Sequence, residues 1–359
     1  FSGASLPPST VAFTLPLSLN NSFPPAYHVP TSGTWNFSLQ HQFGSNWMMS
    51  AEYAGAMGYW ISSNQKGDSE PINTAEYIPR TGPTRAPLST EASTQQRRPY
   101  ASFGPVYILS PDFNSNYNAL ELSAQKRFNH GLSVIANYTW SKAMDNYPPN
   151  ECAWTDPYNR NFDWGVSSDN VTNAFHLSEV WETPHANAHG VAGALLNGWE
   201  VNSITTWQNG FPFTIVSGVD NSLSGNGFDR ANFTGTSIQQ AVLGDQPHGQ
   251  MVQRYFNTSL FTVNPIGTFG NTGKNILQGP GFFRTDFGLI KNTKVTETTS
   301  VQFRAEFFNL FNNVNFYGPN SNVSSSSFGR ITRTAGTFGG VDTGIGAPRI
   351  LQFALKFIF

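Results

Sequence analysis

Apolar and polar side chains alternate along nine segments of this chain, while the period of an α-helix is scarce. A period of two places successive side chains on opposite sides of an extended backbone, so it is typical of a β-strand with two different faces. In the last segment, one face carries only large apolar side chains: Leu351, Phe353, Leu355, Phe357 and Phe359. The nine predicted strands are 35–43, 47–55, 118–128, 132–141, 174–182, 199–208, 283–291, 299–309 and 350–359.

Short and long connections alternate between these strands. The shorter ones are 44–46, 129–131, 184–198 and 292–298, and the long ones are 56–114, 142–173, 209–280 and 310–348. Connections in a compact soluble domain usually have about 4–6 residues, whereas outer-membrane barrels combine tight periplasmic turns with extended extracellular loops. With the end of the last strand on the periplasmic side, every shorter connection falls on that side and every long one outside.

The fold prediction follows from what lipid requires of a sheet. A spanning sheet must pair every backbone group, present apolar side chains to lipid and place aromatic rings near the membrane surfaces. We therefore predict an all-β protein: an antiparallel transmembrane β-barrel segment of about nine strands, with short periplasmic turns and long extracellular loops, which is an incomplete barrel. A soluble β-sandwich is the less favoured alternative, because it would bury the apolar faces without requiring long loops at one end only.

Composition supports this prediction and narrows the function. Charged residues make up 12% of the chain and aromatic residues 14%, and the formal net charge is −2. Such a chain is too apolar to be disordered and has no basic excess for binding nucleic acid, and no run of about 18 apolar residues indicates a transmembrane helix. The single cysteine, Cys152, excludes a disulfide framework within the chain and is expected to be an unpaired loop thiol, or to pair outside it.

Several segments resemble the C-terminal barrel of TonB-dependent transporters, in their Oar-like branch. The matching segments are 115–120 (SNYNAL), 138–142 (YTWSK), 303–312 (FRAEFFNLFN), 97–100 (RRPY), 267–271 (GTFGN) and 279–283 (GPGFF). The resemblance implies a barrel of 22 strands with an N-terminal plug, energised by the TonB complex of the inner membrane. It also implies that the outer-membrane assembly machinery recognises the terminal pattern of Phe353, Leu355, Phe357 and Phe359.

The chain departs from the family pattern because it has only about nine of these strands and no plug. We therefore expect a fragment: residues 1–34 as a loop or linker from a preceding part, and residues 35–359 as the C-terminal portion of an outer-membrane β-barrel. An odd strand number also differs from the even numbers of single-chain bacterial barrels. The energy-coupling TonB complex would then act through the missing N-terminal part.

Polar positions of the alternating segments are candidates for the barrel lumen. They are Glu121, Gln125, Arg127, Gln302, Arg304, Glu306, Gln352 and Lys356. Arg304 and Glu306 are two residues apart and share a face, so their charges are placed to bind each other, the plug or a permeating solute.

Aromatic side chains beside Asn and Asp in the long loops are candidates for ligand contact, because a ring face packs against the C–H bonds of a sugar. The candidates are Trp154, Tyr158, Trp164 and Phe213. Packing of the loops on themselves is the alternative explanation, and the sequence favours it.

Catalytic and metal motifs are weak, so we predict neither an enzyme nor a cofactor. Ser123 and Lys126 have the Ser-x-x-Lys spacing, but residues three apart on a strand point to opposite faces. Loop carboxylates could hold calcium through oxygen ligands, although solvated turns are favoured because no regular spacing appears. These carboxylates are Asp145, Asp156, Asp163, Asp169, Asp220 and Asp229.

Together these patterns favour a binding and transport protein of the bacterial cell outer membrane. The leading hypothesis is active uptake of a small molecule, such as a saccharide or peptide, by a TonB-dependent receptor whose loops capture the ligand. A passive porin or adhesive barrel and an outer-membrane hydrolase are the alternatives. The expected partners are outer-membrane lipid, the assembly machinery, the TonB complex and the ligand, but not nucleic acid.

Overall fold

A computed structural model describes residues 14–22, 24, 27–62, 70–79, 89–109, 111–147, 154–227, 229–338, 341–342 and 346–359. Its main element is one antiparallel sheet of nine long strands. These strands are β2 (Thr31–Phe43), β3 (Trp47–Ile61), β6 (Phe113–Asn129), β7 (Leu132–Asp145), β9 (Asn173–Glu182), β10 (Trp199–Gln208), β15 (Phe282–Lys294), β16 (Ser300–Phe308) and β19 (Ile350–Ile358). The predicted fold class and all nine predicted strands are confirmed.

The remaining elements are short and lie in the connections. The strands are β1 (Leu17–Ser22), β4 (Glu70–Pro71), β5 (Phe103–Ile108), β8 (Gly165–Val166), β11 (Pro212–Phe213), β12 (Asn232–Phe233), β13 (Phe261–Thr262), β14 (Leu277–Gln278), β17 (Thr337–Phe338) and β18 (Val341–Asp342). The helices are α1 (Gly190–Leu196) and α2 (His248–Met251), with 3₁₀ turns at Glu91–Ser93, Gln95–Arg97, Arg160–Asp163, Ile238–Ala241 and Thr258–Leu260. In the described part of the chain, every helix is too short or too polar to cross a membrane.

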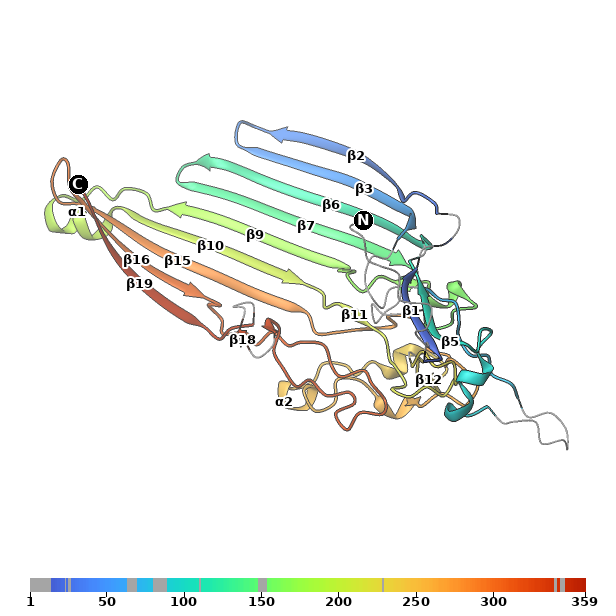
Figure 1. Cartoon of the computed structure of the whole chain (residues 1–359). Coiled ribbons are helices and arrows are strands. Elements are labelled where there is room, and N and C mark those ends of the chain that lie inside the picture. Colours follow the sequence, from blue (N-terminus) through green and yellow to red (C-terminus); the bar gives the residue numbers. More distant parts are fainter. Residues whose placement is uncertain are drawn as a thin grey trace, which may run out of the picture.

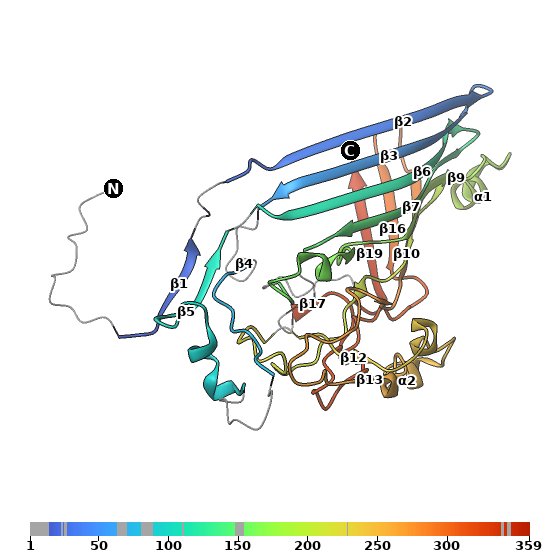
Figure 2. The same cartoon turned by 90° about the vertical axis from the view of Figure 1, so that its right-hand side faces the viewer.

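The sheet is open. Its strand order is β2-β3-β6-β7-β9-β10-β15-β16-β19, so each long strand pairs with its neighbours in the chain, and β2 and β19 are the two edges. Figure 1 shows the strands side by side as one curved wall, and Figure 2 shows that the edge strands run in clearly different directions. This accumulated rotation is the normal twist of a sheet.

The connections separate to opposite ends of the sheet, as the sequence predicts. The hairpin turns, α1 and the C-terminus lie at one end in Figure 1, and β1, β5, β12 and α2 lie at the other. We call these the turn end and the loop end. The turn between β6 and β7 is built by His130 and Gly131, which both have positive φ (51° and 77°). Two consecutive positive φ values define the turn type that best matches the twist of a hairpin.

The cross-strand register divides the sheet into a polar and an apolar face. Residues paired across antiparallel strands share a face, and Glu52, Glu121 and Thr139 form one such row. Tyr53, Leu120 and Trp140 form the adjacent row on the opposite face. The apolar face is uncovered: the Phe353 side chain, for example, is 63% exposed. The two faces are therefore those that the alternation predicts, and the exposed apolar face rules out the sandwich alternative.

Aromatic residues on the apolar face gather in two rows. Near the loop end, Tyr138, Phe175, Trp207 and Phe283 are paired in sequence across four strands. Near the turn end lie Trp181 and Trp199. On β10, Trp207 lies eight positions after Trp199, which is about 26 Å along the strand at roughly 3.3 Å per residue. With the usual strand tilt this gives about 20 Å across the membrane, close to the roughly 25 Å height of an apolar barrel band.

The strands extend further toward the loop end than the sequence pattern predicts. β3 continues to Ile61 and β6 begins at Phe113, so the first long connection is 62–112 rather than 56–114. β2 likewise begins at Thr31, inside the segment expected to be a linker. Earlier still, β1 pairs in parallel with β5 of the first long connection.

The long connections fold into a packed unit of their own at the loop end. Its hydrophobic centre is formed by buried residues of the connection 209–281, with Val323 and Phe328 of the connection 309–349 packed against them. The buried members are Ile215, Ala231, Ala241, Phe256, Phe261 and Leu277. We call this packed region, with the loop segments that contact it, the loop unit. The protein thus consists of a two-faced sheet and a compact cap of loops at one end.

Candidate functional site

The loop unit is held together by a buried ion pair. Arg230 donates to a carboxylate oxygen of Asp163, and both side chains are almost completely buried. Arg230 also donates to the carbonyl oxygens of Thr272 (3.1 Å) and Phe162 (2.8 Å), while Asp163 accepts from the backbone N–H and hydroxyl of Thr155. Burial lowers the pKa of Arg230, and the charge of Asp163 opposes that change. The connections 146–172 and 209–281 are therefore joined by a buried, hydrogen-bonded ion pair.

A second ion pair attaches the loop unit to the sheet. Lys274 donates to Asp145, the last residue of β7, and its side chain is buried. Burial lowers the pKa of Lys274, whereas Asp145 raises it. The next residue, Asn275, donates to the carbonyl oxygen of Val166 in β8 (2.8 Å) and accepts from the hydroxyl of Thr214 (2.9 Å). These contacts fix the position of the segment before β14 against the loop end of the sheet.

The predicted ligand-contacting aromatic residues have different environments. Trp154 is 1% exposed and stacks on Phe113 at a centroid distance of 5.0 Å, so its ring serves loop packing, the explanation that the sequence favours. Tyr158 and Trp164 are exposed, although the Tyr158 hydroxyl donates to the carbonyl oxygen of Thr74 (2.9 Å). Phe213 packs beside Phe256 of the loop core at 5.7 Å and also borders a pocket.

That pocket lies at the loop end, has a volume of about 790 Å³ and is lined by aromatic and small polar residues. We call it the aromatic pocket. Its aromatic lining consists of Phe211, Phe213, Phe282, Phe316 and Tyr317, and its polar lining includes Asp169, Gln208 and Asn209. Gln208 and Phe282 are a cross-strand pair on the polar face of the sheet, so the pocket borders that face.

Sequence reasoning missed most of this pocket. Three segments far apart in the chain each place Phe beside Gly and Pro: 210–213, 279–282 and 316–319. Their shared composition is visible in the sequence. Their meeting is not, because it depends on how two long connections fold against each other.

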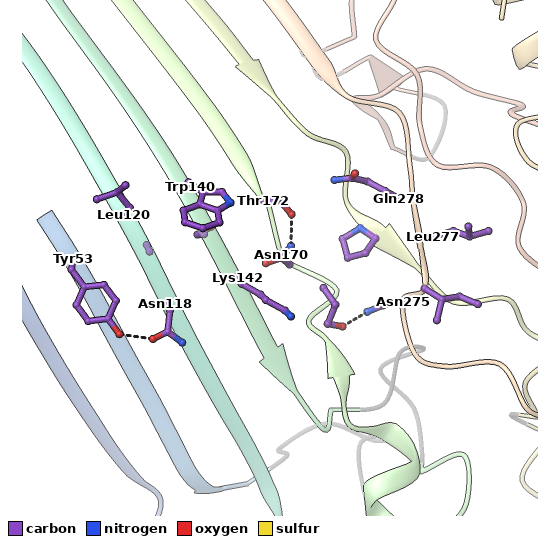
Figure 3. A pocket seen from close by; sticks show the side chains of 15 residues that line it. Tyr53, Asn118, Leu120, Trp140, Lys142, Asn170, Thr172, Asn275, Leu277 and Gln278 are labelled. Carbon is purple, nitrogen blue, oxygen red and sulfur yellow. Dashed lines mark hydrogen bonds between the residues drawn. The ribbon is translucent and has the colours of Figure 1, made fainter. Parts of the chain in front are cut away.

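A second pocket, of about 550 Å³, lies where β3, β6 and β7 approach the loop unit (Figure 3). Its strand lining consists largely of apolar-face side chains, including Tyr53, Leu120 and Trp140. The Tyr53 hydroxyl donates to the side-chain oxygen of Asn118 (2.6 Å), and the segment around Asn275 closes the other side. This strand-end pocket thus lies at the border of the apolar band. Tyr and Trp rings, which combine an apolar body with one polar atom, are typical of this border.

The register places the predicted lumen residues together on the polar face. Glu306 is paired with Gln352, and Gln302 is paired with Asn292 and Lys356. Arg304 donates to Glu306 (2.8 Å), as expected from their spacing. On the other half of the sheet, Glu121 and Gln125 occupy the same face, and Arg127 follows the last regular pair of β6.

The predicted assembly signal forms the edge strand β19. Its alternate residues Phe353, Leu355 and Phe357 pair with Ala305, Phe303 and Val301 of β16, all on the apolar face. The side chains of this strand are exposed, including that of Phe359 beyond its end. The terminal pattern therefore lies on one accessible edge of the sheet.

The loop carboxylates do not gather into one acidic cluster. Among the described residues, His, Cys, Asp and Glu form no group of three or more that could hold a metal ion. Asp145 and Asp163 are paired with Lys274 and Arg230, and Asp156 accepts from the backbone N–H of Tyr158 (3.0 Å). Cys152 lies outside the described residues.

The exposed apolar face, the aromatic rows and the separation of turns from loops define a membrane barrel wall. The chain matches the model of the outer membrane beta barrel domain over residues 2–352. It belongs to this family, and its location is the bacterial outer membrane. A comparison with curated proteins finds no match.

Solved structures with detectable similarity are distant. The outer membrane transporter YddB from Escherichia coli is 9% identical, with a TM-score of 0.47, and the match covers 95% of this chain and 34% of that one. The FrpB iron transporter from Neisseria meningitidis is 10% identical, with a TM-score of 0.39 and coverages of 94% and 32%. BauA, the ferric preacinetobactin receptor from Acinetobacter baumannii, is 11% identical, with a TM-score of 0.39 and coverages of 91% and 29%. The chain thus spans about a third of the length of these proteins.

Proposed function

We propose that this chain forms the C-terminal part of the barrel of a TonB-dependent outer-membrane transporter, which takes up a saccharide or peptide actively. The observation that carries the proposal is the two-faced antiparallel sheet whose long connections, in their described parts, pack together at one end. This arrangement offers a membrane-facing surface, a polar inner surface and an extracellular binding region. The segments that resemble this class of transporter, such as 303–312, support the choice of mechanism.

A larger barrel is part of the proposal because lipid cannot satisfy open sheet edges. β2 and β19 are the edges of the sheet, and each presents unpaired backbone groups. A spanning sheet of this kind must close, and among the described residues no strand pairs with these outer edges. Further strands of the same transporter would close the wall and enclose the plug through which the TonB complex acts.

The aromatic pocket is the proposed place of ligand capture. Its rings can pack against the C–H faces of a sugar or against peptide side chains, and Asp169 and Asn209 supply hydrogen-bonding groups beside them. Pockets that combine mostly apolar walls with a few polar groups are the usual form of a small-molecule site. Exposed Trp164 and Tyr158 are further candidates for contact at the rim of the loop unit.

The polar face is the proposed path inward. It begins beside the pocket at Gln208 and continues over the sheet to residues such as Glu306 and Lys356. Because these residues alternate with the apolar row, the ligand and the lipid meet opposite sides of the same strands. Arg304 and Glu306 neutralise each other, so this part of the path favours neutral or zwitterionic ligands.

The test is growth of a strain that lacks the complete gene, supplied with single saccharides or peptides as the carbon source. Complementation with the wild-type gene should restore growth on one class of compound, and removal of TonB or addition of a protonophore should abolish it. Uptake that persists without the energy source would instead identify a passive porin, and equal growth with and without the gene on every compound would contradict transport of these ligands.

The proposed pocket is tested in the same strain by Phe211→Ala. The Phe211 side chain is exposed at the pocket, and loss of a stacking ring worth about 1 kcal/mol should lower uptake at low ligand concentration roughly fivefold. The matched control is Tyr100→Ala, which removes another exposed loop ring outside the pocket and should leave uptake unchanged. Equal effects of the two variants would move ligand capture away from this pocket.

A further inference from the structure

Asp229 is a buried carboxylate without a cationic partner. Its residue is 1% exposed, and within the described ranges it takes part in no ion pair. The other deeply placed loop carboxylates are compensated, since Asp163 binds Arg230 and Asp145 binds Lys274. An ionised carboxylate taken out of water without a partner costs several kcal/mol, so this position requires a physical explanation.

Three buried oxygen atoms around Asp229 have no hydrogen-bond partner. They are Oδ1 of Asp229, Oδ1 of Asn264 and Oγ of Ser217, and the residues are 1%, 1% and 0% exposed. Buried polar atoms are nearly always bonded, so three unbonded oxygens in adjoining residues are unusual.

The contacts among these three residues make them neighbours in the loop unit. The side-chain nitrogen of Asn264 donates to Oδ2 of Asp229 (2.8 Å), which sets the amide beside the carboxylate. The backbone N–H of Ser217 donates to the carbonyl oxygen of Asp229 (2.9 Å), next to the antiparallel bridge between Val216 and Arg230. Residues paired directly in this way have their side chains on the same face, with Cβ atoms about 5 Å apart.

Two hydrogen bonds donated by the side-chain nitrogen fix the orientation of the Asn264 amide. Its nitrogen donates both to Asp229 and to the carbonyl oxygen of Thr268, so the remaining amide atom, which has no hydrogen-bond partner, is the oxygen. The second carboxylate oxygen of Asp229 is already occupied by the backbone N–H of Ser222 (2.6 Å) and by Asn264. The unbonded set therefore consists of acceptors, one of them charged.

We propose that Asp229, Asn264 and Ser217 bind a calcium ion that stabilises the loop unit. The donor set fits this ion because calcium takes oxygen ligands of mixed type, including carboxylate and amide oxygens and water, in an irregular geometry. The three residues offer neither sulfur nor imidazole, which zinc and copper prefer, and magnesium demands a stricter octahedron. Water completes the coordination of an ion held by three protein atoms.

The electrostatics agree with this assignment. Ser222 donates its backbone N–H to Asp229 and its hydroxyl to Asp220, so two carboxylates are neighbours here. Asp220 itself accepts hydrogen bonds from Ser222, Ser224 and Gly225, so a second carboxylate lies one serine away. A divalent cation would neutralise the field that these two carboxylates create.

The ion would join segments that are far apart in the chain. Ser217 and Asp229 flank the 217–229 segment, Asn264 belongs to the stretch after β13, and Ser224 accepts from the backbone N–H of Ala75 in the first long connection. Calcium at Asp229 would therefore order distant parts of the connection 209–281 and the contact of this connection with the first long connection. The proposal does not rest on transport, because the ion is bound to the protein whether or not the protein moves a ligand.

The experiment uses the complete protein, purified in detergent, with calcium as the probe. Equilibrium dialysis against radioactive calcium is carried out on the wild type, on Asp229→Asn and on Asp245→Asn. Asp245 is an exposed carboxylate of the same connection, so its variant is the matched control for loss of one charge. We expect Asp229→Asn to weaken one site at least tenfold, from a dissociation constant of about 10⁻⁴–10⁻³ M, and Asp245→Asn to leave it unchanged.

Thermal unfolding supplies a second readout, because the melting temperature of Asp229→Asn relative to the wild type should differ between the calcium-free and the calcium-loaded protein. Without calcium, Asp229→Asn should melt at the same or a higher temperature than the wild type, because it removes an uncompensated buried charge. With 10 mM calcium, the wild type should melt several degrees higher than in chelator, and the variant should show no such shift. If Asp229→Asn does not fold, Ser217→Ala decides the question, since it removes one ligand and should weaken the same site.

Two results would overturn the proposal. Equal calcium binding by the Asp229 and Asp245 variants would place the ion elsewhere. An unchanged melting temperature of the wild type between chelator and calcium, together with a more stable Asp229→Asn variant, would show that the unbonded oxygens surround water. Either result leaves the growth phenotype of the complete gene unaffected, so it is distinguishable from failure of the proposed transport function.

Discussion

The sheet and the loop unit distribute polar and apolar side chains in opposite ways. On the sheet, large apolar residues such as Phe37, Leu39 and Phe353 are exposed on one face. In the loop unit, charged and amide side chains such as Arg230, Asp163 and Asn264 are buried beside a conventional apolar core. One chain thus contains a region built for lipid and a region built for water.

The difference shows where each region obtains its backbone hydrogen bonds. In the sheet, neighbouring strands satisfy them regularly, so side chains are free to match the solvent on each face. The loops have few regular backbone hydrogen bonds between strands, so side chains bond to the backbone instead. Asn309, for example, donates to the carbonyl oxygens of Asn313 (2.9 Å) and Ala347 (3.1 Å). Asn73 likewise donates to three carbonyl oxygens between residues 100 and 104. Buried polar residues in the loop unit are therefore structural.

The largest expected effect comes from breaking the buried ion pair of the loop unit. Arg230→Met would keep an unbranched apolar side chain but remove the guanidinium and leave Asp163 buried without its partner, at a cost of about 3–5 kcal/mol. Hydrogen exchange of the complete protein should show faster exchange in the connections 146–172 and 209–281. Amides in β6 and β7 should keep their protection, because the sheet does not depend on this pair.

The double variant Arg230→Met/Asp163→Asn is the control for this prediction. It removes the uncompensated charge, so most of the lost stability should return. A double variant as unstable as the single one would mean that the packing of Arg230 against Phe162 matters more than its charge.

A smaller effect separates the two faces of the sheet. Ala124 lies on the apolar face, paired with Ala136 halfway between Leu132 and Trp140, and its neighbour Ser123 lies on the polar face. Ala124→Arg should destabilise the folded barrel by about 2–4 kcal/mol, because it places a charge in the lipid core. Ser123→Arg should cost much less. Urea titration of the complete protein in lipid bilayers measures both, and equal losses would contradict the assignment of the faces.

The sequence predicts the sheet well because its signal is local. Alternation along each strand identifies the face of each residue, and the nine strands, their order and the two ends of the sheet follow from it. The strand ends are less predictable. After Gly55, the polar-face positions of β3 are occupied by Ala56 and Gly58, so polar and apolar residues no longer alternate. The strand nevertheless extends to Ile61, because its backbone still pairs with β2 and β6.

The loop unit was predictable only in part, because its contacts join distant residues. Trp154 stacks on Phe113, and Arg230 binds Asp163, 67 positions earlier in the chain. Neither spacing has a period that a local pattern can reveal. The sequence identifies aromatic residues and carboxylates as candidates, but which rings stay exposed and which carboxylate lacks a cation depends on the folded connections.

The smallest expected effect concerns a tyrosine that connects the loop core with β14. The Tyr255 hydroxyl donates to the carbonyl oxygen of Gln278 (3.0 Å), and burial raises the pKa of Tyr255 to about 12. Tyr255→Phe should therefore cost about 1 kcal/mol near pH 8, the usual net value of one hydrogen bond.

Alkaline conditions reverse the order of wild type and variant. In the unfolded chain a tyrosine ionises near pH 10, so the stability that neutral Tyr255 contributes is complete below pH 10 and is lost as the pH rises toward 12. Hydrogen exchange or proteolysis of the loop unit, compared at pH 8 and pH 11, should show a smaller loss for Tyr255→Phe than for the wild type. Equal losses would mean that Tyr255 is hydrated in solution. The sheet would keep its stability in both proteins, because the titrating Tyr255 lies in the loop unit and not in the sheet.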